Sequence, residues 1–96
     1  MGETPQKKIV ITVIGRDQVG IVANIATVLA ETGVNIEDIN QKILGESIFA
    51  MTLLADMAAS SLSLGELAER LDGVGEDLGL KIMAHDAEVF RFMHRV

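Results

Sequence analysis

Residues 8–21 are KIVITVIGRDQVGI, and this stretch contains the change of pattern on which the predicted fold depends. Its first half, residues 8–14, is rich in β-branched side chains, which favour a strand. Apolar residues occupy both alternating positions, so such a strand requires cover on both faces. Residues 15–20 hold glycines around polar residues, as is typical of a turn, and helical spacing begins at Ile21. The stretch therefore predicts a strand, a tight turn and a helix in direct succession.

The residues downstream of this first helix predict a hairpin. The helical spacing stops before Gly33, a residue suited to the left-handed conformation at the end of a helix. A strand is predicted over 34–43, with a bulge at 37–38 because the apolar alternation breaks there. A turn at 45–46 and a further strand over 48–57 complete the hairpin.

The remainder of the chain predicts a helix, a strand and a short final helix. Leucine and valine recur at three- and four-residue spacing over 64–78, and Ser63 with Glu66 forms a capping-box pattern at the start. A strand is predicted over 80–85, after Gly79. Apolar residues at helical spacing then follow Asp86, which is suited to the N-cap of a short helix.

The predicted order is strand, helix, strand, strand, helix, strand, followed by the terminal helix. Two right-handed split βαβ units of this kind form a ferredoxin-like α+β sandwich, in which an antiparallel four-stranded sheet carries both helices on one face. A chain of 96 residues allows one domain. We expect that domain to span 1–96, with a core at 8–86 and the C-terminal helix at 87–96.

The other face of such a sheet is left bare, and its composition bears on assembly. Both alternating sets of the first and third strands are largely apolar, which predicts a hydrophobic patch that soluble monomers rarely expose. Hydrophobic residues make up 49% of the chain, a large share for so small a core. We therefore expect a homodimer or a higher oligomer. Cover by the terminal helix alone is the alternative.

Composition argues against several classes of function. The chain has no cysteine, which excludes thiol chemistry and favours a reducing, cytoplasmic location. Its net charge of −6 and its three aromatic residues argue against nucleic-acid binding. No apolar run approaches the ~20 residues of a membrane span. His85 and His94 lack metal-ligand spacing, and no nucleophile–base pair is visible. We therefore predict no metal, no cofactor and no enzymatic activity.

The turn at 15–20 is the strongest candidate for a binding site. Amides at the start of a helix have no acceptor within the helix and carry the positive end of its dipole, so they attract anions. Gly20 allows a ligand to approach the backbone closely. Asp17 either accepts a hydrogen bond from an ammonium group or caps the helix, and the sequence favours neither alternative.

Two further groups of polar residues have weaker functional interpretations. One interrupts the apolar strand at its expected bulge and comprises Asn35, Glu37, Asp38 and Asn40. Bulges often aim side chains at functional sites, although a solvated strand edge explains the same pattern. The other group lies on the second predicted helix and is most simply its solvated face, comprising Glu66, Glu69, Asp72, Glu76 and Asp77.

The motif GRDQVGI at 15–21, followed by GVNI at 33–36, resembles the ACT domain family. The ending at 89–96 is similar to that of stand-alone single-ACT proteins of prokaryotes, which are related to glycine cleavage repressor-like ACT repeats. The resemblance implies a ferredoxin-like fold, pairing of domains and amino-acid effectors held at the pair interface. Val19 stands where many ACT domains carry proline.

The resemblance and the polar cluster together give a set of candidate ligand-binding residues. The first turn and the residue after the Gly-Val pair come from the resemblance, and Asp38 comes from the cluster at the expected bulge. The set is Arg16, Asp17, Gln18, Val19, Gly20, Ile21, Asn35 and Asp38. The leading hypothesis is a non-catalytic regulatory dimer that binds an amino acid. The alternative is a protein-interaction module without a small ligand, and a small enzyme such as an acylphosphatase has only Arg16 in its support.

Overall fold

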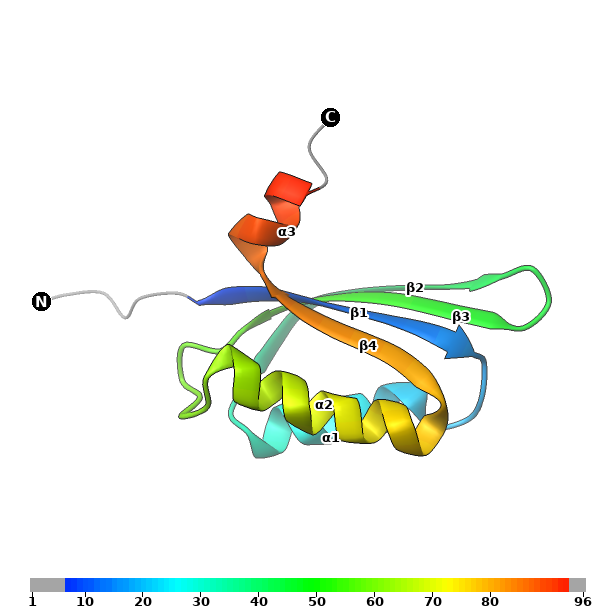
Figure 1. The fold of residues 1–96 in the computed structure, drawn as a ribbon, viewed down its shortest axis with the longest axis horizontal. Coiled ribbons are helices and arrows are strands. Elements are labelled where there is room, and N and C mark those ends of the chain that lie inside the picture. Colours follow the sequence, from blue (N-terminus) through cyan, green and yellow to red (C-terminus); the bar gives the residue numbers. More distant parts are fainter. Residues whose placement is uncertain (1–6, 94–96) are drawn as a thin grey trace, which may run out of the picture.

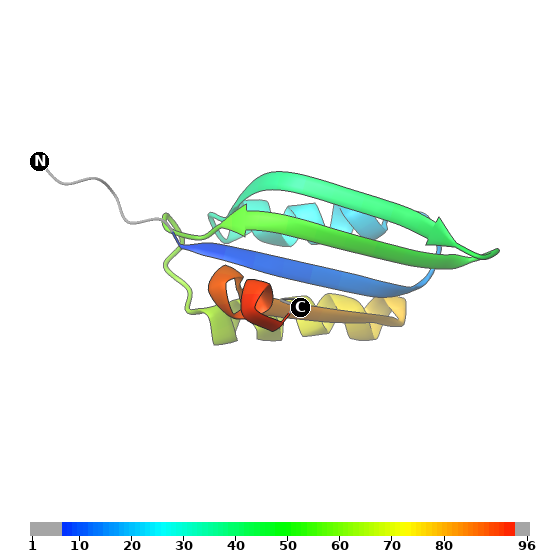
Figure 2. The same ribbon diagram turned by 90° about the horizontal axis from the view of Figure 1, so that it is seen from above.

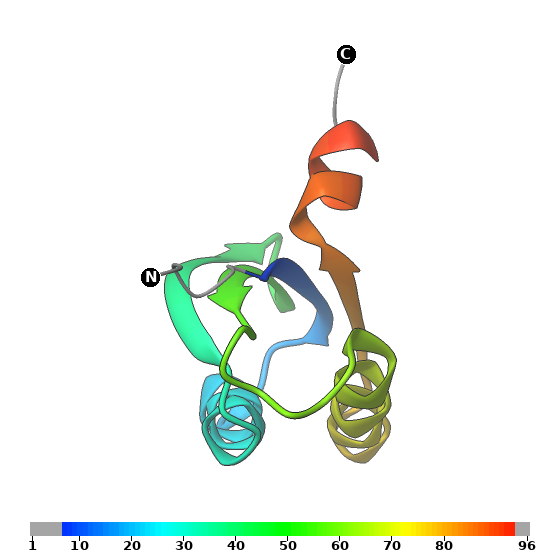
Figure 3. The same ribbon diagram turned by 90° about the vertical axis from the view of Figure 1, so that its left-hand side faces the viewer.

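The computed structural model describes residues 7–93, and its elements follow the predicted order. They are β1 (Lys8–Arg16), α1 (Ile21–Glu31), β2 (Asn35–Leu44), β3 (Ile48–Asp56), α2 (Leu64–Leu78), β4 (Leu80–Asp86) and α3 (Ala87–Met93). The strands form one antiparallel sheet in the order β2-β3-β1-β4. Helices α1 and α2 lie on one face of it, and α3 stands off the other (Figures 1 and 3). The ferredoxin-like prediction is therefore confirmed.

Local signals in the sequence place most of the boundaries correctly. Ser63 and Glu66 form the predicted capping box at the start of α2. The strand register shifts between Ile36 and Asp38, which confirms the bulge. β1 is longer than predicted, because its pairing with β3 continues to Arg16. The predicted terminal helix is described up to Met93, and its last residues, 94–96 with His94, lie outside the described part.

The core lies between the sheet and the two helices that cover it. One alternating set of β1 side chains points into it together with β3, and the apolar stripes of α1 and α2 close it from the other side. Nine of these side chains are at most 2% exposed: Ile9, Ile11, Val13, Ile21, Ile25, Leu29, Leu53, Leu67 and Leu71. Burial of each contributes roughly 1.5–3 kcal/mol before conformational entropy is subtracted.

The open face of the sheet is less uniformly apolar than the sequence analysis predicts. α3 packs against β1 and β4 at one end of this face, where Val10 is only 7% exposed. In the middle, Thr12 and Thr52 pair across β1 and β3. Toward the other end, Ile14 remains 49% exposed. A polar row therefore divides the apolar surface, and the alternative in which the terminal helix alone covers the face is wrong, because α3 reaches one end only.

The hairpin of β2 and β3 extends beyond the helices that cover the sheet (Figures 1 and 2). β2 is the edge strand, and its ten residues are exposed apart from the half-buried Ile36. Ile43 pairs with the buried Phe49 and so points to the helix side, yet it is 51% exposed. An edge strand of this length, bare on both faces, offers unpaired backbone groups to another strand.

Candidate ligand-binding corner

The corner between β1 and α1 is fixed by hydrogen bonds to two distant parts of the chain. The Asp17 amide donates to the Ser47 carbonyl at the tip of the β2–β3 hairpin, at 2.8 Å. The Gln18 side-chain amide donates to the carbonyl of Leu78 at the end of α2, also at 2.8 Å, and to the carbonyl of Arg16 at 3.2 Å. The backbone of the corner is therefore held in place from both sides before any ligand arrives.

The start of α1 presents its amides without a side-chain cap. Gly20 is the N-cap, in the left-handed conformation at φ 93°, and no side chain makes a capping hydrogen bond there. The first amide bonded within the helix is that of Asn24, which donates to the Gly20 carbonyl at 2.9 Å. The three amides before it have no acceptor within the helix. Of the two alternatives for Asp17, capping is therefore excluded.

A hollow of about 380 Å³ lies between this corner and the hairpin. Asp17 supplies a carboxylate to its wall and Lys42 an ammonium group, while Ile43 and Phe49 supply apolar surface and Gln41 an amide. Its volume falls within the range of small-molecule sites. One negative group, one positive group and an apolar wall match a small zwitterion that carries an apolar side chain.

The four hairpin residues of this hollow were not among the predicted site residues. Their position follows from strand register, because Arg16 at the end of β1 pairs with Ile48 at the start of β3. The tip of the hairpin must then lie beside the corner that follows β1. A consideration of strand pairing, and not of motifs, is the signal that could have found them.

The predicted ligand-binding residues occupy two ends of the molecule. Arg16 to Ile21 lie together at the corner, where Val19 is fully exposed and Ile21 is buried in the core. Asn35 pairs with Asp56 at the far end of β3, and Arg16 pairs with Ile48 at the near end. At 3.3 Å per residue these ends are about 26 Å apart. Within one chain, a small ligand at the corner cannot contact Asn35.

The polar cluster at the bulge has a structural role in the described chain. Glu37 reaches over the sheet to the Lys8 ammonium group at 2.6 Å, and Asp56 lies 3.6 Å from the same group. The hydrogen bond from Glu37 raises the pKa of Lys8 above 10.5. Asp56 accepts from the amides of Ala58 at 2.9 Å and Lys7 at 3.0 Å, which lowers its pKa below 3.8. The bulge thus aims Glu37 at Lys8.

We expect Asp56→Asn to lower the melting temperature at neutral pH and to flatten its fall in acid. Because the folded pKa of Asp56 lies below 3.8, the stability from its carboxylate is present above about pH 4 and is lost as pH falls through the folded pKa. Thermal melts between pH 2 and 7 would measure both effects. Asp38→Asn, an exposed carboxyl on β2, is the control. Identical acid limbs in the wild-type chain and Asp56→Asn would contradict the assignment.

Two other kinds of site receive no support from residues 7–93. Across that range, no three histidine, aspartate or glutamate side chains gather so as to hold a metal ion. No helix of the described part is long and apolar enough to cross a membrane. The five acidic residues predicted to form the solvated face of α2 are all exposed.

The fold and the corner define the class of this protein: ferredoxin-like α+β modules in which the first strand enters the first helix through a glycine-bounded turn. The model of the ACT domain family matches residues 7–85, and the chain belongs to that family. A UPF0237 protein of Methanopyrus kandleri is 48% identical over 87 residues, which are 91% of this chain and 96% of the relative.

Solved structures agree with this membership. An ACT domain protein from Streptococcus pneumoniae superposes with a TM-score of 0.77 at 32% identity, over 90% of this chain and 96% of its own. A protein assigned as a glycine cleavage system transcriptional repressor superposes with a TM-score of 0.68 at 26% identity, over 82% of this chain and 44% of its own. Both resemblances inferred from the motifs, to ACT domains and to glycine cleavage repressors, are confirmed.

Proposed function

We propose that this ACT domain is a non-catalytic regulatory module that binds an amino acid in the hollow beside Asp17 and acts as a homodimer. The observation that carries the proposal is the chemistry of the hollow, which sets an acidic and a basic side chain against an apolar wall next to the start of α1. The unit of function is the whole chain, 1–96. Its lack of cysteine fits a reducing, cytoplasmic setting.

Each part of an amino acid has a counterpart at this corner. The α-ammonium group suits the Asp17 carboxylate, and the α-carboxylate suits the uncapped amides of α1 and the Lys42 ammonium group. An anion at a helix start gains roughly 0.3–1 kcal/mol, or up to ~2 where it is partly buried. Ile43 and Phe49 offer apolar surface to the side chain of the ligand. The arrangement therefore favours a zwitterion over a simple anion.

A second copy is needed if Asn35 and Asp38 are to reach this ligand. β2 is an exposed edge strand, so two copies can extend their sheets through it. Antiparallel pairing over the whole strand sets residue 35 of one chain opposite residue 44 of the other. The partner's Asn35 and the partner's Asp38 would then lie beside Leu44 and Gln41, at the hollow. Two copies related in this way form two identical composite sites.

The regulatory part of the proposal has support from the comparisons. The structural relative assigned as a glycine cleavage system transcriptional repressor is by name a regulator. The name concerns that protein, and it fits a role here as a sensor that carries no chemistry of its own.

Calorimetric titration with each of the common amino acids tests the proposal. We expect one class of them to bind with dissociation constants between about 1 mM and 1 μM, or about −4 to −8 kcal/mol. Asp17→Ala should weaken that binding about 10- to 100-fold, because it removes a charged hydrogen bond worth about 1.5–3 kcal/mol. Asp72→Ala, an exposed acid on α2, is the matched control and should bind as the wild-type chain does.

The opposite result has a clear meaning as well. If no amino acid binds at millimolar concentration, the sensing function is wrong. The module would then act through protein contacts alone, which is the alternative from the sequence analysis.

A further inference from the structure

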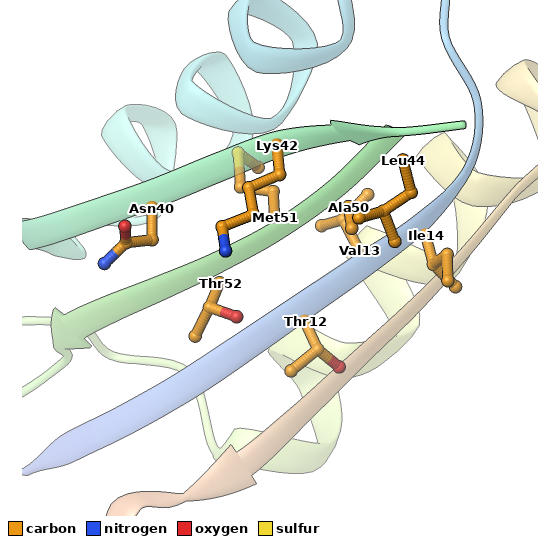
Figure 4. Close-up of a pocket in the computed structure, with 9 residues that line it drawn as sticks. All are labelled: Thr12, Val13, Ile14, Asn40, Lys42, Leu44, Ala50, Met51 and Thr52. Carbon is orange, nitrogen blue, oxygen red and sulfur yellow. The ribbon is translucent and has the colours of Figure 1, made fainter. Parts of the chain in front are cut away.

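A second hollow, of about 720 Å³, lies on the open face of the sheet at the hairpin end. Figure 4 shows Ile14, Leu44 and Ala50 at one side of it and the two threonines, Thr12 and Thr52, at the other. Ile14 is 49% exposed and Leu44 is 46% exposed. This apolar surface plays no part in the proposed amino-acid site, which opens on the helix side of the hairpin, and it is the end of the face that α3 leaves bare.

α3 is an unusual neighbour for this hollow, because it projects from the same face at the opposite end (Figures 1 and 3). It has seven residues and packs only against β1 and β4. A helix this short is not stable in isolation. Its Val89 side chain is 51% exposed, and its Glu88 side chain is 80% exposed. The helix therefore presents an apolar and an acidic side chain that no other part of the described chain covers.

The projection of α3 restricts how a second copy can cover this face. Two open faces cannot lie against each other in the same orientation, because the two α3 helices would collide. With the second copy turned by a two-fold rotation, each α3 instead lies over the hairpin end of the other chain. An arrangement of this kind is isologous, since the same two surfaces meet twice.

Charge favours α3 as the occupant of the hollow. Lys81, Ile14, Ala50 and Lys42 form one row across β4, β1, β3 and β2. A lysine therefore flanks the apolar floor at each edge of the sheet. Glu88 of an incoming α3 would meet this positive rim while Val89 meets the floor. Opposite charges at the rim of an interface guide the partner and fix its orientation.

We infer that two copies of this chain dock through their open faces, with the α3 helix of each seated in the open-face hollow of the other. This contact uses a different surface from the β2 edge. Both contacts are compatible in one assembly, and together they give a tetramer. The inference does not rest on amino-acid binding, because none of its residues other than Lys42 lines the corner site.

The absence of cysteine from the chain makes a direct cross-linking test possible. A disulfide requires two Cα atoms within about 7 Å. α3 begins after Asp86, which pairs with Ile9, whereas Ala50 pairs with Ile14. Five residues of β1 separate these rows, about 16 Å at 3.3 Å per residue, so a link between α3 and position 50 joins two chains.

The full-length variant with both Ala50→Cys and Val89→Cys should form a covalent dimer on mild oxidation, visible on a non-reducing gel. The matched pair Glu69→Cys with Val89→Cys, in which the first cysteine lies on the exposed face of α2, should remain single chains. Absence of the link in the Ala50 pair would overturn the inference. So would equal linkage of Val89→Cys alone, because the two α3 helices would then meet each other.

A charge exchange tests the same contact without cross-linking. Lys81→Glu and Glu88→Lys should each weaken open-face association about tenfold in sedimentation or light scattering, and the combined variant should recover most of it. A combined variant as weak as the single ones would contradict the docking. Loss of amino-acid binding with an unchanged cross-link would affect the proposed function and leave this inference intact.

Discussion

Replacement of Gly75 by alanine is expected to destabilise the fold by about 1–3 kcal/mol, although alanine is the better helix former. Gly75 is buried in α2, where the helix comes closest to β4. A Cβ atom added there would lie 2.6 Å from the Leu80 carbonyl oxygen and 3.6 Å from the Ile82 side chain. The Leu80 oxygen belongs to the backbone, so relief requires the helix and the strand to move apart.

Gly73, on the same helix, is the matched control. An added Cβ atom meets nothing within 4 Å there. Alanine at this exposed position should stabilise the chain by up to about 1 kcal/mol, through helix propensity alone. Urea unfolding of both variants measures the two effects with opposite signs. A stabilising Gly75→Ala would show that α2 and β4 are not packed as closely as described.

The second large effect is expected from mixing two variants that fail separately. If the ligand site is shared between chains, Asp17→Ala and Asn35→Ala should each bind the amino acid at least about tenfold more weakly. A mixed pair contains one site that has lost both residues and one that has kept both. After joint unfolding and refolding, half of the pairs are mixed, so about a quarter of all sites should bind with wild-type affinity.

The control for this experiment is a mixture of Asp17→Ala with the chain that carries both substitutions. No pair in that mixture holds an intact site, so binding should not recover. Failure of recovery in the first mixture as well would contradict a site shared through β2. It would leave open-face docking untouched, because that contact involves neither residue.

Much of the fold could be predicted because its signals are local. The β-branched run before Gly15, the capping box at Ser63 and the broken alternation at Glu37 each act within a few residues. The candidate site was predicted in part for the same reason, since the turn and helix start are contiguous. Lys42, Ile43 and Phe49 were missed, because they reach the corner through strand pairing alone.

By itself, the sequence determined the elements, their order and the glycine-bounded corner, because alternation, helical spacing and capping depend on neighbouring residues. Tertiary structure alone decided which of two similar glycines in α2 is indispensable, since only Gly75 faces the backbone of β4. It also decided that Asp17 and Asn35, which the motifs treat as one site, lie at opposite ends of the sheet. Strand register sets that distance, and register is fixed by pairing between segments far apart in the chain.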